Sequence, residues 1–273
     1  MARSGVGLAV LLIAALCALV LVVVATTMRD PAAAPAPGTA PDAASPGPPQ
    51  WSDEFAGSAL DPAWEVYDSA GHDDNGERRP SQVTVADGVM TQTGTADARS
   101  AGMVLQGRDA RYGRWDVRFR AAPTADPVGV PYHFVVALLP VGVPYAEGER
   151  DIDFAEGDVG SGTLDLFVHH PRNKQDYAEV PLDVTAWHSV GVEITPDHLT
   201  WFVDGVPTIT DTRPEALPQT PLSLNVQLDA NAPRGLAPAV LQLDWVRYQR
   251  LPTPRPAASP APAPAQGDYD PSS

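Results

Sequence analysis

Apolar and polar residues alternate with a period of two through most of residues 51–250. Side chains of a β-strand point to opposite faces in turn, so this period predicts strands with one buried and one polar face. No long segment carries the 3.6-residue apolar stripe of an amphipathic helix, and the best helical candidate is the short connection 184–189, VTAWHS. Many short strands within about 200 residues predict an all-β sandwich of two packed antiparallel sheets.

Two Asp-Gly pairs strengthen this prediction because each lies between two alternating stretches. Asp-Gly is typical of the tightest β-hairpin turns. The hairpins are predicted in QVTVADGVMTQTG, residues 82–94, and LTWFVDGVPTIT, residues 199–210. Further strands are predicted in GRWDVRFRA, LSLNVQLDA and VLQLDWVRYQ.

Pro and Ala are concentrated on both sides of this region, which limits the core to one domain. Residues 30–50 have little to bury and predict a semi-rigid linker. Residues 251–273 have the same chemistry and predict a disordered tail. One folded domain is therefore expected over 51–250, acting as a monomer.

The N-terminal region, residues 1–29, contains an uncharged apolar run over 5–25. A run of this length matches the ~20 residues of a membrane-spanning helix, and the flanking charges place the N-terminus in the cytoplasm. The sequence thus predicts export, with a single-pass anchor at the cell surface, or secretion if the chain is cleaved near Ala25. Cys17 lies inside this run, so the exported part contains no cysteine and no disulfide.

The formal net charge of −16 excludes some partners. Nucleic acid requires a basic face that displaces counterions, so it is not expected as a partner, nor is an anionic membrane surface for the folded domain. A neutral partner is compatible with this charge.

The acidic stretch ERDIDFAEGD, residues 149–158, is the main candidate site. In a regular strand Asp151 and Asp153 share one face, while Ile152 and Phe154 face the core. Glu156 would fall on the core side unless one extra residue near Ala155 forms a β-bulge, a feature common beside active sites.

Three interpretations of these carboxylates are open. They could be a solvated face of an acidic protein, although like charges in neighbouring positions cost stability. They could bind calcium, although no loop with calcium-ligand spacing is visible, so neither a metal nor another cofactor is predicted and a structural calcium stays open. They could also hydrolyse glycosidic bonds, which needs one protonated and one ionised carboxyl group.

The motif DIDFAE resembles the signature of glycoside hydrolase family 16, Glu-x-Asp-x-x-Glu in its bulged form. The segments WSDEFAGSALDPAWEVYDSAG, SAGMVLQGRDARYGRWDVRFRA, AWHSVGVEITPDHLTWFVDG and LQLDWVRYQ resemble other parts of that family in the same order. The similarity covers essentially all of residues 51–249.

The resemblance implies a concanavalin A-like β-jelly roll that hydrolyses internal β-glycosidic bonds of a polysaccharide such as a β-glucan. It implies that Glu156 is the general acid/base, Asp151 the nucleophile and Asp153 the acid that tunes both. It also implies that His169 and Gln227 lie near the substrate. A structural role is an equal alternative for these last two residues.

The sequence departs from the family at two points. The usual nucleophile is Glu, and Asp151 is one methylene shorter, which leaves retaining hydrolysis, inverting hydrolysis and sugar binding without hydrolysis as alternatives. Glu149 is a less suitable substitute nucleophile. A Trp usual before the motif is missing, with Tyr145 as a possible replacement, and in the polar loop 71–80 Asn75 or Arg79 could reach a sugar hydroxyl.

Overall fold

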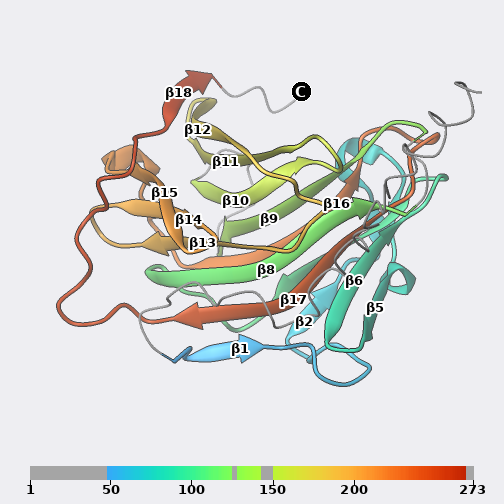
Figure 1. The fold of residues 1–273 in the computed structure, drawn as a ribbon, viewed down its shortest axis with the longest axis horizontal. Coiled ribbons are helices and arrows are strands. Elements are labelled where there is room, and N and C mark those ends of the chain that lie inside the picture. The colour runs from blue at the N-terminus through green and yellow to red at the C-terminus, as the bar shows by residue number, and fades with distance from the viewer. Residues whose placement is uncertain (1–47, 125–127, 143–149, 269–273) are drawn as a thin grey trace, which may run out of the picture. The chain divides into compact units, whose positions relative to one another are not determined.

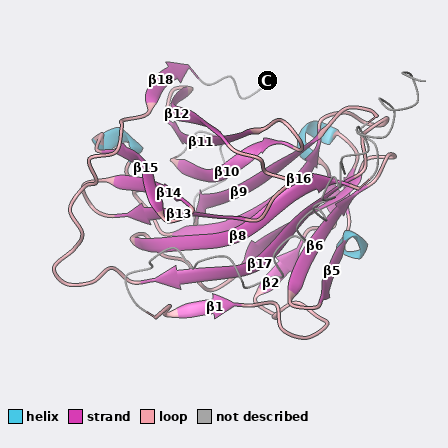
Figure 2. Ribbon diagram, viewed as in Figure 1, coloured by secondary structure: helices cyan, strands magenta, loops and turns pink. Residues whose placement is uncertain are grey.

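The computed structural model describes residues 48–124, 128–142 and 150–268, which form a sandwich of two β-sheets (Figures 1 and 2). Pairing in the described residues is antiparallel apart from β4, which runs parallel to β7 over two residues, and a single parallel bridge between Val130 and Leu236. The prediction of an all-β protein with two antiparallel sheets is confirmed. The apolar segment 5–25 and nearly all of the linker lie outside the described residues.

The first sheet contains eight described strands. Its order is β15 (Val206–Asp211), β14 (Leu199–Val203), β13 (His188–Ile194), β8 (Gly113–Pro123), β17 (Ala239–Gln249), β6 (Val89–Gly94) and β5 (Val83–Ala86), with β1 (Trp51–Asp53) also paired to β17.

The second sheet contains ten described strands and carries the candidate site. Its order is β18 (Ala265–Asp268), β12 (Lys174–Pro181), β11 (Thr163–His170), β10 (Asp151–Asp158), β9 (Tyr132–Pro140), β16 (Leu222–Ala230), β7 (Arg99–Leu105), β4 (Glu77–Arg78) and β3 (Ser69–Ala70), with β2 (Trp64–Val66) also paired to β7.

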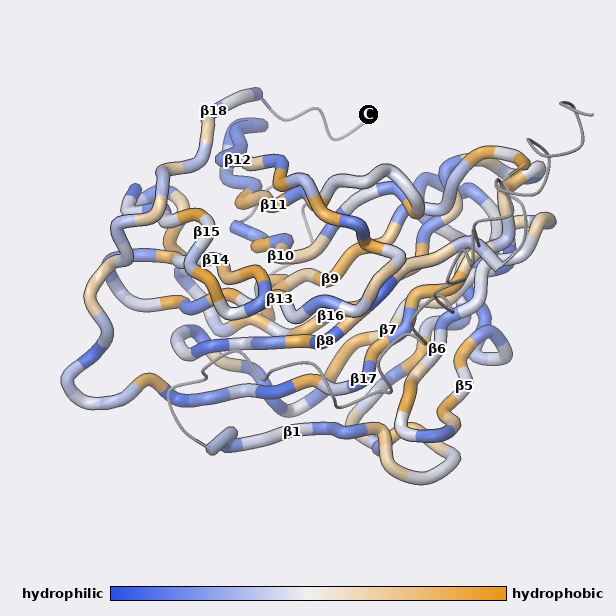
Figure 3. The backbone as a smooth tube through the Cα atoms, in the orientation of Figure 1, coloured by the Kyte–Doolittle hydropathy of each residue, from blue (hydrophilic) through white to orange (hydrophobic). Residues whose placement is uncertain are grey.

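The core lies between the sheets and is built from the alternating apolar positions. Hydrophobic and hydrophilic segments alternate along many strands in Figure 3. On β9, Phe134 is fully buried and its ring centroid lies 5.6 Å from that of Phe119 on β8, so this pair joins the two sheets. The intervening residues of β9 point to the opposite face, which is the face of the candidate site.

Both predicted hairpins are present. Asp87 and Gly88 connect β5 to β6 with φ of 53° and 76°, and Asp204 and Gly205 connect β14 to β15 with φ of 47° and 73°. Two consecutive positive φ values define a type I′ turn, whose twist matches that of the strands.

The best helical candidate, 184–189, is not helical, and a turn precedes β13 there. The Asp183 side chain accepts hydrogen bonds from the Thr185 backbone nitrogen at 3.1 Å and the Thr185 hydroxyl at 2.6 Å. An Asp that bonds the backbone two residues later stabilises either a turn or the first turn of a helix. Here β13 already begins at His188, so the chain turns into a strand before a helix can continue. The only helices in the described ranges are the 3₁₀ turns η1 (His72–Asp74), η2 (Pro80–Gln82) and η3 (Pro214–Ala216).

The described part of the chain holds no helix long and apolar enough to cross a membrane.

The C-terminal region differs from the predicted disordered tail. Residues 251–268 run along one side of the sandwich, past β15, and end in β18, which pairs with β12 (Figure 1). The stretch 265–268, AQGD, contains no proline, so its backbone amides are free to pair with an exposed strand edge. Pairing of this kind needs backbone groups rather than apolar side chains, which is why composition alone did not reveal it.

Candidate active site

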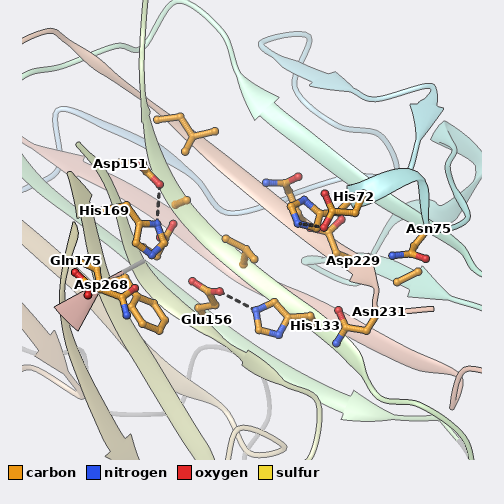
Figure 4. Close-up of a pocket in the computed structure, with 18 residues that line it drawn as sticks. His72, Asn75, His133, Asp151, Glu156, His169, Gln175, Asp229, Asn231 and Asp268 are labelled. Atoms are coloured by element: carbon orange, nitrogen blue, oxygen red, sulfur yellow. Dashed lines mark hydrogen bonds and ion pairs between the residues drawn. The ribbon is translucent and has the colours of Figure 1, made fainter. Parts of the chain in front are cut away.

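A cleft of about 630 Å³ crosses the outer face of the ten-stranded sheet (Figure 4). Its walls come from six neighbouring strands, β18 to β16, and from the region of η1. The residues that line it are His72, Asp73, Asn75, His133, Val135, Ala137, Leu139, Asp151, Asp153, Glu156, Phe167, His169, Gln175, Gln227, Asp229, Ala230, Asn231 and Asp268.

A β-bulge in β10 brings three acids into this cleft. Asp153 is paired with Ala137 of β9 and the next pair is Ala155 with Val136, so Phe154 is the additional residue on this side. The pairing of β10 with β11 also shifts between Asp153 and Glu156. Ile152 and Phe154 are fully buried in the core, as predicted, while the carboxyl groups of Asp151, Asp153 and Glu156 line the cleft.

His169 lies between the first two acids. Its Nδ1 atom is 3.1 Å from Oδ2 of Asp151 and 3.5 Å from Oδ2 of Asp153, and all three residues are buried. Burial alone lowers the pKa of His169, but the hydrogen bond to Asp151 and the charges of both aspartates raise it to about 9. The imidazolium therefore supplies the positive charge that allows two buried carboxylates to lie side by side.

Glu156 is held by a second histidine from the adjacent strand. His133 of β9 donates from Nε2 to Oε1 of Glu156 at 2.8 Å and from Nδ1 to Oδ1 of Asp158 at 2.9 Å. Asn231 donates to the same Asp158 oxygen at 3.2 Å. Burial lowers the pKa of His133, but these two acids raise it to about 10, so the ring is a cation at neutral pH.

Asp165 is the cross-strand neighbour of Glu156 on β11. Burial and the nearby charges of Glu156 and Glu179 raise the pKa of Asp165 to about 6. The Asp165 carboxyl group therefore keeps its proton to a higher pH than an ordinary aspartate does, directly beside Glu156.

The other predicted site residues divide into three groups. His169 and Gln227 both line the cleft, as does Asn75. Arg79 instead forms ion pairs with Asp68 and Glu77, away from the cleft-lining set. Glu149 and Tyr145 lie outside the described residues.

Several cleft residues are not predicted from the sequence. His133 follows the alternation of β9, but its contact with Glu156 depends on which strands are neighbours and in what register. His72 and Asp229 come from parts of the chain far from the acidic motif. Asp229 forms a 2.6 Å ion pair with Arg78, which fixes its carboxylate at the wall of the cleft. The polar residues at alternating positions of β16 are the one signal that could have indicated a functional face.

Asp151, Asp153 and His169 also form a group that could hold a metal ion, since one donor atom from each lies within 4.8 Å of the others. A metal bound by His169 must displace a proton from its imidazolium. The two aspartates stabilise this protonated ring and so oppose the displacement. Calcium prefers six to eight oxygen ligands, and two carboxylates with an imidazole do not match that preference.

Comparison with known proteins identifies the family. The model of glycosyl hydrolases family 16 matches residues 72–247, which is more than half of the chain. The chain therefore belongs to glycosyl hydrolase family 16. No curated protein sequence gives a match.

The fold is similar to several solved laminarinases. That of Flavobacterium sp. UMI-01 has a TM-score of 0.64 at 17% identity, over 74% of this chain and 100% of the other. That of Rhodothermus marinus has a TM-score of 0.62 at 23% identity, over 74% and 96%. The catalytic domain of an endo-1,3-β-glucanase from Thermotoga petrophila RKU-1 has a TM-score of 0.61 at 18% identity, over 74% and 96%. The two sheets thus form the jelly-roll sandwich expected from the sequence.

Proposed function

We propose that this protein is a glycoside hydrolase that cleaves internal β-glycosidic bonds of a β-glucan-type polysaccharide. One observation carries the proposal: the bulge in β10 brings Asp151, Asp153 and Glu156 onto one face, in a cleft that crosses the sheet. Membership of family 16 supports the reaction class, and the similar structures named as laminarinases support the choice of a β-glucan.

In this proposal Glu156 is the general acid and later the general base. Its side chain is 19% exposed, against 6% for Asp151, so it is the carboxyl group more accessible to a leaving oxygen. When Glu156 transfers its proton, negative charge develops on its carboxyl group. His133 already donates a hydrogen bond to Oε1, and its positive charge stabilises the developing carboxylate.

Asp151 is the proposed nucleophile, or the base that activates water in an inverting reaction. Asp153, which lies between the two acting residues in the sequence, tunes them electrostatically, and the His169 imidazolium counters the charges of Asp151 and Asp153. Retaining hydrolysis places the two acting carboxyl groups ~5–5.5 Å apart, and inverting hydrolysis ~6.5–9.5 Å.

Glu156→Gln tests the central assignment. The amide cannot donate the proton that the leaving oxygen needs, so we expect kcat on a soluble β-1,3-glucan to fall by roughly 10²–10⁴. The matched control is Asp158→Asn, which alters the other hydrogen-bond partner of His133 but leaves Glu156 in place. Its loss of activity should be much smaller.

Two outcomes contradict the assignment. Full activity of Glu156→Gln would remove this residue from the chemistry. A wild-type protein that is retained on a polysaccharide column but turns over no β-glucan would instead be a carbohydrate-binding jelly roll without catalysis.

We also propose that the folded domain is exported and acts at the cell surface. The uncharged run over 5–25 and the adjacent linker support this location. Extraction of cell membranes with alkaline carbonate tests it, because an anchored protein stays in the membrane fraction and a cleaved protein is recovered from the medium without residues 1–25. Recovery in the cytoplasmic fraction would contradict export.

A further inference from the structure

The C-terminal strand lies outside the family match but contributes to the cleft. The match ends at residue 247, whereas Asp268 of β18 is one of the cleft-lining residues. β18 extends the ten-stranded sheet by one strand beyond β12 and so forms the outermost described wall at this end of the cleft. β18 therefore lies in a part of this chain that the family model does not match.

The strand is fixed to the sandwich by contacts at several points. Residues 265–268 pair with residues 174–177 of β12. The Thr210 backbone nitrogen donates to the Pro262 carbonyl at 2.9 Å, and the Gln266 amide donates to Oδ1 of Asp176 at 3.3 Å. Asp176 is fully buried and also pairs with Arg213 at 3.0 Å. The wall is therefore held in place at its base as well as along its backbone.

The surface beside this wall combines an aromatic face with polar groups. Phe167 and Tyr177 are cross-strand neighbours with ring centroids 6.5 Å apart in a stacked arrangement. Tyr177 is 38% exposed. A side-chain carbon at Gly267 would lie 3.2 Å from its ring, so glycine at this position keeps the ring uncovered. An exposed Tyr ring and a half-buried Phe ring next to carboxylate and amide groups are suited to a sugar, which presents an apolar ring face and hydroxyls at its edge.

Gln175 and Asp268 supply these polar groups. Both line the cleft (Figure 4). Gln175 is the cross-strand partner of Gly267, and Asp268 is the next residue of β18, where it pairs with Lys174. Strands are ~4.8 Å apart, so β18 is roughly 14 Å from β10 across two intervening strands. Gln175 lies one strand nearer, on β12, at roughly 10 Å from β10. Both separations are longer than one sugar ring, so the pair lies beside a unit at least one position away from the cleaved bond.

The charge of the cleft limits the chemistry of that unit. Six acids line the described cleft, and no Lys or Arg is among the lining residues. The His133 and His169 cations pair with the acids of β10, and Lys174 pairs with Asp268 from outside the lining set. The described lining thus offers no Lys or Arg to bind the anionic group of a uronic acid or a sulfated sugar, while the Asp268 carboxylate accepts hydrogen bonds from uncharged hydroxyls.

We propose that β18 completes a distal sugar-binding subsite, in which Asp268 and Gln175 bind hydroxyls of an uncharged glycan chain beside Phe167 and Tyr177. The subsite makes the enzyme favour long chains over short ones. This inference rests on the proposed glycosidase function, because it concerns the same cleft.

The test measures kcat/KM of the full chain on β-1,3-linked gluco-oligosaccharides, from the shortest that is cleaved to the heptasaccharide. Asp268→Ala and Gln175→Ala should each lower kcat/KM about three- to tenfold on the longest substrate, the worth of one or two hydrogen bonds. The shortest substrate does not reach β18, so its kcat/KM should be unchanged. Asp268→Asn keeps a group that bonds hydroxyls and should restore most of the loss.

Lys174→Met is the matched control, because Lys174 forms an ion pair with Asp268 but is not among the cleft-lining residues. If this variant loses as much on long substrates as Asp268→Ala, the carboxylate acts by fixing the strand, and direct sugar binding is overturned. Equal losses on short and long substrates, or none, overturn the distal subsite while leaving the proposed function intact. Failure of the wild-type protein both to cleave and, by calorimetry, to bind every oligosaccharide overturns the proposed function and the subsite together.

Discussion

At the scale of single residues, the site depends on two histidines that neutralise clustered acids. The side chains of Asp151 and Asp153 are each 6% exposed, and unpaired charges at such positions are costly. His169 meets this cost with one ring nitrogen near both carboxylates, and His133 performs the same role for Glu156 and Asp158. The acids are therefore stable in the fold because of cations that come from neighbouring strands.

Asp151→Glu is the variant that tests the role of the shorter acid. A Glu side chain extends further by one methylene, on the order of 1 Å, toward the separation that retaining hydrolysis requires. We expect kcat to rise several-fold, measured on a soluble β-1,3-glucan, with NMR of the first-formed anomer showing retention. A fall in kcat together with an inverted first product would instead identify Asp151 as the base that activates water.

Asp165→Asn tests the electrostatics beside Glu156. The folded-state pKa of Asp165 is about 6, above its usual value of 3.8, so ionisation is disfavoured in the folded protein. Its carboxyl group therefore lowers the free energy of unfolding as pH rises from about 4 through about 6. The variant should be more stable than the wild type at about pH 8, by about 1 kcal/mol because Asp165 is partly exposed, and equal to it near pH 4.

Urea denaturation at both pH values measures this difference. An equal shift in stability at the two pH values would show that the effect of the substitution is not electrostatic.

At the level of secondary structure, the bulge in β10 is the feature that brings three acids of one strand to the same face of the sheet. A regular strand would direct Glu156 into the core with Ile152 and Phe154. One additional residue on β10 changes the face of every position that follows it, which is why the three acids share one cleft.

The Asp-Gly turns are a second local feature, because each sets the register of a β-hairpin. Gly88→Ala tests one of them. Gly88 has φ of 76°, and the nearest atom to an added side-chain carbon is 4.0 Å away, so there is space and the cost is backbone strain alone. We expect the free energy of unfolding to fall by about 1–2 kcal/mol in urea denaturation. Asp87→Asn is the control and should change stability little, since Asn adopts positive φ readily. A neutral Gly88→Ala would mean that the turn relaxes to another type.

At the scale of the whole molecule, the C-terminal region closes the edge of the sheet that carries the cleft. If the chain ends at Arg250, the edge of β12 loses its partner β18. Hydrogen exchange should then become faster at the β12 amides that face this edge, because a free strand edge exposes its backbone to water. Exchange in β16, at the centre of the sheet, serves as the control. Unchanged exchange in β12 would show that β18 does not pair with it in solution.

The sequence alone determines the local features of this protein. A period of two and the Asp-Gly pairs at 87–88 and 204–205 predict the strands and hairpins, because these depend on residues adjacent in the chain. The motif at 151–156 predicts the acids for the same reason, and its resemblance to the bulged signature of the family predicts the bulge.

Which residues lie next to those acids depends on the tertiary structure. His133 meets Glu156, Arg78 meets Asp229, and β18 joins β12 across separations of 23, 151 and about 90 residues. Such contacts depend on the order and register of strands in the sheet, and no local preference encodes them. Backbone pairing also requires no particular side chains, so a Pro/Ala-rich segment without a strand pattern can still form the last strand of the sheet.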